Sequence, residues 1–177
     1  MPRRASAEDL TVHAGASAAD FEAELSPLLD DALRLATAML LRSADAEDAV
    51  QEACLHAWRR RHNRRPGTDL RPWFLGIVAN RCREARRGRW WGLLRVADVP
   101  VNSMVTTNDP AALMDLRGAL SRLPHRRRLA VVLRYYLDLP YEGVAAAMGC
   151  SVDAAKALVR RGTTDLERAL RVSEPKT

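Results

Sequence analysis

Apolar residues recur every three to four positions along most of the chain, which is the spacing of one face of an α-helix. The first such stretch covers residues 21–40, and Pro27 predicts a break or kink within it. A second helix is expected from Ser43, ending in an arginine run before the turn signal Pro66-Gly67. No segment has the strict alternation of a half-buried strand, so the pattern predicts an all-α protein.

The middle of the chain carries a third helical pattern and then loses its periodicity. The pattern begins at Asp69 or Leu70, has Pro72 near its start and is expected to stop at Gly88. Residues 92–110 contain two prolines among several Thr, Asn and Val residues and have no helical spacing. We expect this segment to be a linker.

Helical patterns return at Ala111 and continue to about residue 171, divided by Pro124 and Pro140. Ser151 is expected to cap the last helix. The sequence therefore predicts an all-α fold of two small helical bundles joined by a flexible linker. The expected divisions are a flexible tail at 1–18, a first bundle at 19–91, the linker at 92–110, a second bundle at 111–172 and a tail at 173–177.

Composition narrows the class of protein. No apolar run approaches the roughly 18 residues of a membrane span, and the polar N-terminus lacks the apolar segment of a secretory signal. A cytoplasmic location and no membrane partner are therefore expected. The histidines are scattered, the cysteines have no zinc-site spacing, and no phosphate loop or catalytic set is apparent. We expect no enzyme activity, cofactor or metal, and mostly buried, reduced thiols at Cys54, Cys82 and Cys150.

The formal net charge of +6 conceals a strong asymmetry. Residues 1–58 have a net charge of −7, residues 59–100 of +9 and residues 101–177 of +4. This division suggests an acidic surface that faces a protein, followed by basic surfaces that face a polyanion. Nearly all of the basic residues are arginine, which suits bidentate contacts with phosphates and base edges.

Residues 141–162 have the spacing of a helix-turn-helix. A short helix is followed by Gly149, which tolerates the left-handed turn conformation, and then by a longer helix. In this motif the second helix enters the major groove of DNA. Lys156, Arg160 and Arg161 would then contact phosphates or base edges. An ordinary helical hairpin with a solvent-exposed basic face is the alternative.

A second basic region combines arginines with aromatic residues. The arginine run at 59–65 is followed by Trp73, Asn80 and Arg81. Basic charge interleaved with aromatic rings suits single-stranded DNA, because bases stack on rings while arginines meet phosphates. The alternatives are a solvent-exposed basic face for the arginine run and core packing for Trp73 and Trp58.

The expected second helix is amphipathic, with an acidic first half. Acids at positions 45, 47, 48 and 52, with Gln51 among them, form one polar face. Negative charge in the first turn also suits the helix dipole. The opposite apolar stripe, which is expected to be buried, consists of Val50, Cys54, Leu55 and Trp58.

Taken in order, these segments resemble the sigma-70 family of transcription initiation factors, in particular its small extracytoplasmic-function group. The resemblance covers about residues 20–172, nearly the whole chain. It is carried by the segments Asp45 to Glu52 followed by Trp58-Arg59, Trp73 to Arg81, Leu123-Pro124 with Leu133 to Tyr136, and the helix-turn-helix from Tyr141.

The resemblance implies roles that the residues alone do not assign. The first bundle would be region 2-like and the second region 4-like. The implied partners are core RNA polymerase, through its largest and second-largest subunits, promoter DNA, and an anti-sigma factor. The implied core polymerase-binding residues are Asp45, Asp48, Gln51 and Glu52. Those for the −10 element are Arg60, Arg61, Arg64, Arg65, Trp73, Asn80, Arg81 and Arg83. Those for the −35 element are Ser151, Val152, Asp153, Lys156, Arg160 and Arg161.

Two other functions fit the sequence less well. A stand-alone helix-turn-helix regulator would need a dimerisation element that sets two half-sites one helical turn apart, and no extended heptad is apparent. A module that only sequesters another protein is disfavoured by the charge of +9 in residues 59–100. We therefore expect a transcription initiation factor that binds core RNA polymerase, recognises −35 and −10 elements and promotes DNA opening.

Overall fold

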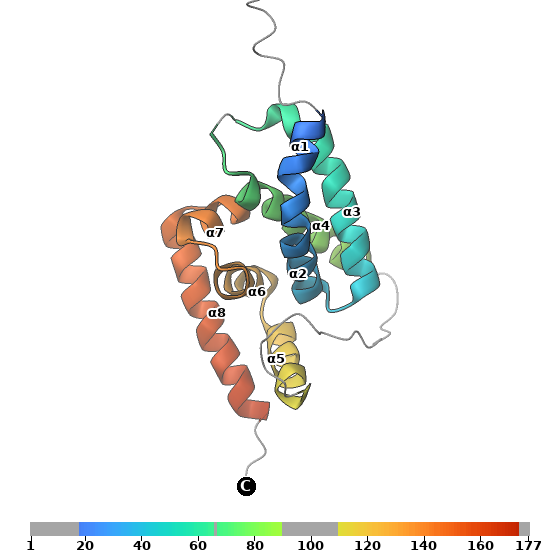
Figure 1. Ribbon diagram of the computed structural model, residues 1–177. Coiled ribbons are helices and arrows are strands. Elements are labelled where there is room, and N and C mark those ends of the chain that lie inside the picture. The colour runs from blue at the N-terminus through green and yellow to red at the C-terminus, as the bar shows by residue number, and fades with distance from the viewer. Residues whose placement is uncertain (1–17, 66, 90–109, 174–177) are drawn as a thin grey trace, which may run out of the picture.

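The computed structural model describes residues 18–65, 67–89 and 110–173, and every regular element in these ranges is helical (Figure 1). The predicted all-α fold of two helical bundles is confirmed. The N-terminal bundle contains α1 (Ala18–Leu25), η1 (Ser26–Leu28), α2 (Leu29–Leu40), α3 (Ser43–Arg60), η2 (Arg61–Asn63) and α4 (Leu70–Arg89). The C-terminal bundle contains α5 (Pro110–Arg122), α6 (His125–Val131), η3 (Val132–Tyr136), α7 (Tyr141–Met148) and α8 (Val152–Ser173).

Three predicted segments lie almost entirely outside the described residues. These are the tail at 1–18, the linker at 92–110 and the tail at 173–177. Their described members are Ala18, Pro110 and Ser173, which belong to α1, α5 and α8. Within the described residues, no helix combines the length and the apolar character that crossing a membrane requires.

Two helices of the N-terminal bundle end where the sequence predicted breaks, one at a proline and one at a residue with a left-handed backbone conformation. Pro27 lies in the 3₁₀ turn η1 between α1 and α2. At the end of α2, Leu41 adopts a left-handed conformation with φ of 62°, and its N–H donates to the carbonyl of Thr37. This turn directs the chain back so that α3 packs along α2.

The buried side of α3 consists of alanines, which corrects the apolar stripe expected from the sequence. Its buried residues form an alanine stripe of Ala46, Ala49, Ala53 and Ala57. Leu55 and Trp58 are instead exposed, and Val50 and Cys54 are half-buried. The reason is close packing, because α2 and α4 both lie against α3 and small side chains let helices approach.

The C-terminal bundle contains the predicted helix-turn-helix. Between α7 and α8, Gly149 has a φ of +60°, the left-handed conformation that glycine adopts without a steric penalty. The Oγ of Ser151 accepts a hydrogen bond of 3.2 Å from the N–H of Ala154, which confirms the predicted cap of the last helix. Val144, Ala155 and Val159 are buried between the helices.

The two bundles pack directly on each other. Helix α4 lies against α7, and α2 contacts α6 and η3. At the α4–α7 contact a Cβ added to Gly76 would lie 2.7 Å from the carbonyl oxygen of Ala147, so the two backbones meet. Buried residues of both bundles belong to one hydrophobic cluster, which includes Phe74 and Val78 on α4 and Leu133 and Val144 on the other side.

Gly162→Ala is expected to destabilise the protein by about 1–3 kcal/mol, because the added methyl overpacks a helix contact. The new Cβ would lie 2.6 Å from Cγ2 of Val131 and 2.9 Å from the carbonyl oxygen of Arg127. The matched control is Gly118→Ala on α5, where a Cβ meets nothing within 4 Å. The control should be neutral or stabilised by up to about 1 kcal/mol, because alanine favours a helix. Equal free energies of unfolding in urea for the two variants would contradict this packing.

Candidate nucleic-acid and protein interfaces

Three of the predicted −10 residues lie on one face of α4. Trp73, Asn80 and Arg83 line a cavity of about 490 Å³ between α4 and the helices α6 and α7 of the other bundle. Asn80 and Arg83 are exposed, and Trp73 is half-buried with part of its ring against the hydrophobic cluster. An aromatic ring, an amide and a cation are thus brought together, as base stacking and phosphate binding require.

Arg81, predicted as part of the same set, lies on another face of α4. Its Nη1 is 2.8 Å from Oε2 of Glu84, and both residues line a cavity of about 320 Å³ beside α3. Successive residues of a helix are rotated by about 100°, so Asn80 and Arg81 diverge. The structure therefore brings Arg81 to the acidic residues of α3 rather than to Trp73.

The arginine run at 59–65 begins in the last turn of α3 and continues through η2. The guanidinium carbon of Arg61 lies 4.0 Å from the ring centroid of Trp58, and its Nη1 donates to the Trp58 carbonyl at 2.7 Å. Arg64 donates to a carboxylate of α1 at 3.3 Å and to a loop carbonyl at 3.0 Å. Arg60 and Arg65 have exposed side chains. Two arginines thus order the loop, and two present charge to solvent.

The predicted core polymerase-binding residues divide between two sides of α3. Asp45, Asp48 and Glu52 line the cavity of about 320 Å³ next to α4. Asp45 is half-buried with its Oδ2 3.5 Å from Nε of Arg42, whereas Asp48 and Glu52 are exposed. Gln51 faces the other side, toward α1 and α2.

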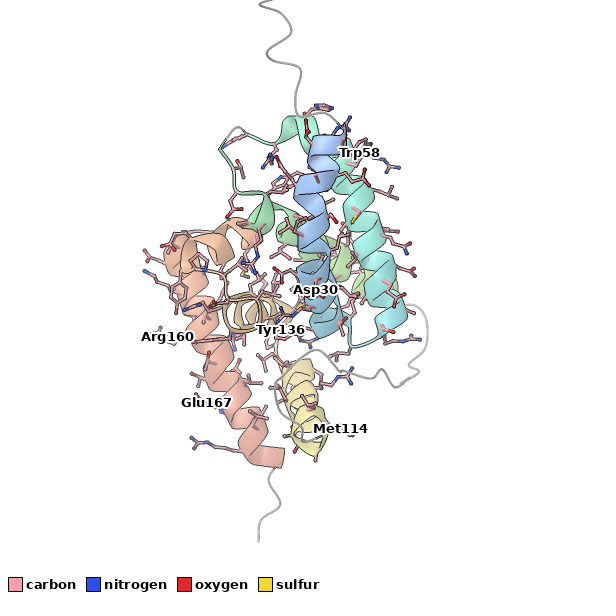
Figure 2. The ribbon with its side chains drawn as sticks, in the orientation of Figure 1. Asp30, Trp58, Met114, Tyr136, Arg160 and Glu167 are labelled. Carbon is pink, nitrogen blue, oxygen red and sulfur yellow. The ribbon has the colours of Figure 1, made fainter. Side chains whose placement is uncertain are left out.

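An apolar groove of about 720 Å³ runs between α1, α2 and α3. Its lining includes the buried ring of Phe21, with Leu29, Leu33, Leu55 and Trp58 between 37% and 56% exposed. The rings of Phe21 and Trp58 meet edge to face with centroids 6.1 Å apart (Figure 2 labels Trp58). Sequence reasoning missed this surface. The alanine stripe of α3 could have revealed this groove. If the regularly spaced alanines form the buried side of α3, its larger apolar side chains must lie on the outer side.

The helix-turn-helix presents the predicted −35 residues on the surface. Lys156 Nζ lies 5.9 Å from the ring centroid of Tyr141, which links α8 to the start of α7. Figure 2 shows Arg160 on the outer side of α8. Val152 is half-buried and packs against the hydrophobic cluster. The exposed members of the predicted set are Ser151, Asp153, Lys156, Arg160 and Arg161.

Ionisable groups line the contact between the bundles, and one of them is fully buried. Arg128 is only 3% exposed, and its Nη1 and Nη2 donate to the carbonyls of Met39 at 3.1 Å and Ser121 at 2.6 Å. Burial, with Arg86 nearby, lowers the Arg128 pKa to about 10, so the side chain remains a cation at neutral pH. Arg86 lies with Nη1 3.3 Å from Nδ1 of His125. Since arginine only donates, this nitrogen of His125 accepts.

All three cysteines are free thiols. Burial raises the pKa of Cys82 to about 12 and also raises that of Cys54. Both groups are therefore protonated and weakly nucleophilic at neutral pH. Cys82 is fully buried and Cys54 and Cys150 are half-buried, in keeping with packing roles.

Two family models match the chain, one on each bundle. The model of sigma-70 region 2 matches residues 25–92, and that of sigma-70 region 4 matches residues 113–166. Together with the two helical bundles, these matches define a sigma-70 family protein, and the chain belongs to that family.

Relatives identify the group within the family. CarQ, an RNA polymerase sigma factor of Myxococcus xanthus, is 31% identical over 136 residues, which cover 75% of this chain and 78% of CarQ. SigG of Mycobacterium tuberculosis is 29% identical over 84% of this chain, which spans 48% of SigG. The sigma factor RpoE of Bartonella quintana, solved with the anti-sigma factor NepR, has a TM-score of 0.72 at 26% identity, covering 88% of this chain and 99% of that one. The chain is an extracytoplasmic-function sigma factor, a promoter-specific transcription initiation factor.

The stability of the protein is expected to fall as the pH decreases from about 6.5 to about 4, because the folded chain favours the neutral form of the half-buried His125. Desolvation, with Arg86, Arg128 and Arg83 nearby, lowers its pKa from 6.5 to about 4. The unfolded chain therefore binds a proton in this range that the folded chain does not, and stability is fully present only above it.

His125→Gln should flatten this dependence of the free energy of unfolding on pH. The matched control is His62→Gln, since His62 is exposed on η2. Urea unfolding of the three proteins at pH 7.5, 6 and 5 provides the comparison. Parallel profiles for His125→Gln and the parent chain would show that His125 does not cause the loss.

Proposed function

We propose that the two bundles divide promoter recognition between them. Residues 19–91 bind core polymerase and the −10 element, residues 111–172 bind the −35 element, and residues 92–110 connect them. The proposal is carried by one observation, that an aromatic and polar face of α4 and a basic face of α8 lie on different bundles. Both family regions are present in that order, which does not favour a stand-alone regulator.

At the −10 element, α4 would hold an unpaired strand. The half-buried ring of Trp73 is fixed on one side by the hydrophobic cluster and offers its other side for stacking with a base. Asn80, two helical turns further along, has an amide that both donates and accepts, as reading a base edge requires. Arg60, Arg65 and Arg83 supply exposed positive charge for the phosphates.

At the −35 element, α8 would enter the major groove by its N-terminal end. Lys156, Arg160 and Arg161 are exposed and suit phosphates or the acceptors of guanine. Asp153 is exposed on the first turn and would accept from cytosine N4, so it disfavours a base edge that presents only acceptors. Ser151 already accepts the N–H of Ala154, and its hydroxyl remains available as a donor.

Core polymerase would bind the N-terminal bundle through α3. The acidic residues Asp48 and Glu52 offer charge to a basic partner, and the adjacent apolar groove offers area for burial. Glu22 and Glu47 also line the groove, so acidic groups lie on both sides of its apolar walls. An amphipathic helix with basic flanks matches this combination. The coiled coil of the largest polymerase subunit is the partner that the family resemblance implies.

Further partners and the location follow from membership of the family. The C-terminal bundle would also contact the second-largest polymerase subunit. RpoE, a structural neighbour, was solved with an anti-sigma factor, and we propose that this chain is also held by one. The protein would act in the cytoplasm, where the polymerase is, as a binding factor without catalytic activity of its own.

Asp48→Arg should weaken retention of core polymerase about tenfold, because it places a like charge against a basic partner. Glu167→Arg on α8 is the matched control, since it makes the same change of charge at an exposed site on the other bundle. Circular dichroism checks that both variants keep the fold. Equal retention of core polymerase by the two variants in a pull-down would refute docking through this face.

Asn80→Ala should lower open-complex formation about tenfold while core polymerase affinity stays unchanged, because the amide contacts DNA only. Gln51→Ala should give the opposite pattern, a loss of core affinity without a separate opening defect. Permanganate footprinting of the reconstituted holoenzyme reports opening, and a pull-down reports core affinity. A matching loss in both assays for Asn80→Ala would exclude a specific −10 role.

A further inference from the structure

Four arginines gather around His125, two of them on α4 and two on α6. Nη1 of Arg86 lies 3.3 Å from Nδ1 of His125, and Arg83 and Arg126 line the cavity of about 490 Å³ together with His125. Desolvation, with the positive charges of Arg86, Arg128 and Arg83, lowers the pKa of His125 to about 4, so these guanidinium groups act on one place. We call Arg83, Arg86, Arg126 and Arg128 the arginine cluster.

The arginine cluster has little negative charge to balance it. Among the residues that the structure describes, no aspartate or glutamate lines this cavity. No ion pair within the described parts of the chain includes Arg83, Arg86 or Arg126, whereas Arg81 on another face of α4 lies 2.8 Å from Oε2 of Glu84. Like charges held close together repel each other, and a bound anion relieves this repulsion. The arginine cluster therefore favours an anionic ligand.

The chemistry of the arginine cluster suits phosphates in particular. A guanidinium group presents a planar fork of N–H donors that matches the oxygen atoms of a phosphate. Arg83, Arg86 and Arg126 are exposed, so their donors are accessible to a ligand. Because they belong to two helices, a ligand with several phosphates can contact more than one of them at once. A polyphosphate thus fits the arginine cluster better than a single carboxylate does.

Other residues of the same cavity provide what a nucleoside requires. The half-buried ring of Trp73 and the exposed amide of Asn80 line the cavity together with Arg83. Trp73 and Arg83 are separated along the axis of α4 by about 15 Å, at a rise of about 1.5 Å per residue. A base can stack on the ring, and the amide can bond to the edge of the base or to a sugar hydroxyl.

The size of the cavity also suits such a ligand. Its volume is about 490 Å³. Sites for small molecules usually have volumes of about 300–1,000 Å³ and combine apolar walls with a few polar groups. Here the apolar part of the wall includes Ile77, Leu129 and Ala147.

We propose that this cavity is a binding site for a free nucleoside polyphosphate. The arginine cluster binds the phosphates, Trp73 stacks on the base, and Asn80 bonds to the nucleoside. A nucleotide within the promoter strand has the same chemistry, and Trp73 and Asn80 are also proposed to bind the −10 element. The site goes beyond that function, because Arg126 and His125 of α6 belong to it and neither is in the proposed promoter-binding set.

Titration calorimetry of the full chain, without DNA or polymerase, tests the site with ATP and with inorganic triphosphate. ATP should bind with one molecule per chain and about tenfold more tightly than inorganic triphosphate, because the base adds a stacking contact. ATP that binds no more tightly than inorganic triphosphate would overturn the assignment to a nucleotide. No measurable heat of ATP binding would overturn the site itself.

Arg126→Gln distinguishes the arginine cluster from a general attraction of anions to a basic chain. It should weaken the binding of ATP and of inorganic triphosphate about tenfold each, because charge-assisted bonds to phosphate are lost. Arg168→Gln is the matched control, since it removes an exposed positive charge near the end of α8 and should leave both affinities unchanged. Equal losses in the two variants would show that net charge alone attracts the anion, and the site would be refuted.

Trp73→Leu tests the position of the base. It should lower the affinity for ATP to that for inorganic triphosphate, because leucine packs against the hydrophobic cluster but cannot stack with a base. The affinity for inorganic triphosphate should stay unchanged, which also checks that the arginine cluster is intact. An unchanged affinity for ATP in Trp73→Leu would contradict the stacking and with it the nucleotide site.

A short single-stranded oligothymidylate distinguishes the free nucleotide from a nucleotide within a strand. Arg126→Gln should leave the affinity for this probe unchanged, because Arg126 lies outside the proposed promoter-binding set. An equal loss of affinity for ATP and for the oligothymidylate would assign the cavity to a nucleic-acid strand instead. Open-complex formation by Asn80→Ala tests the proposed function separately, so nucleotide binding can fail while recognition of the −10 element stands.

Discussion

Small residues at the helix contacts are the constraint on which the rest of the structure depends. The alanine stripe of α3 and the glycines Gly76 and Gly162 let neighbouring helices pack closely. At both glycines an added Cβ would lie within 3 Å of an atom of the neighbouring helix. Large apolar side chains do not fit at these contacts and lie beside them instead. Leu55 and Trp58 thus line an open groove, so the packing that forms the core also forms the groove proposed to bind a partner.

Cations at helix ends are the second recurring interaction. A buried guanidinium is costly unless its N–H groups are bonded, and helix C-termini offer carbonyls with partial negative charge. Arg128 is buried with its Nη1 and Nη2 bonded to carbonyls, although its Nε has no partner, and it keeps its charge. Arg34 and Arg71 are half-buried at the bundle interface and donate to carbonyls there. These bonds favour the observed arrangement of the bundles, in which the carbonyls of Tyr136 and Leu137 lie within reach of the two arginines.

Local features of the fold could be predicted from the sequence, since each depends on residues within one helical turn. The break at Pro27, the turn at Gly149 and the cap at Ser151 are of this kind. The prediction of the buried stripe of α3 was wrong for a different reason. Helical periodicity allows two stripes about 100° apart, and hydrophobicity favours the one with Leu55 and Trp58. The contacts of α2 and α4 select the alanines.

The sequence predicted which residue types form the candidate site better than it predicted how they are arranged in space. Asn80 and Arg81 are neighbours in sequence, yet helical rotation directs them to different faces of α4. The apolar groove combines residues of three helices, so no single segment reveals it. The contacts between the bundles join residues that are even farther apart in the sequence, since Arg34 and Tyr136 are 102 positions apart. Such pairs leave no periodic or local pattern in one sequence.

The proposed polymerase-binding surfaces lie apart from the contact between the bundles. The acidic face of α3 and the apolar groove are accessible while the bundles are packed on each other, with no residue of α7 in their lining. A partner that binds only there makes the same contacts however the bundles are arranged, so it does not by itself change that arrangement. Promoter elements bound by α4 and α8 together, or a polymerase that contacts both bundles, would depend on the arrangement, because their contacts span both bundles.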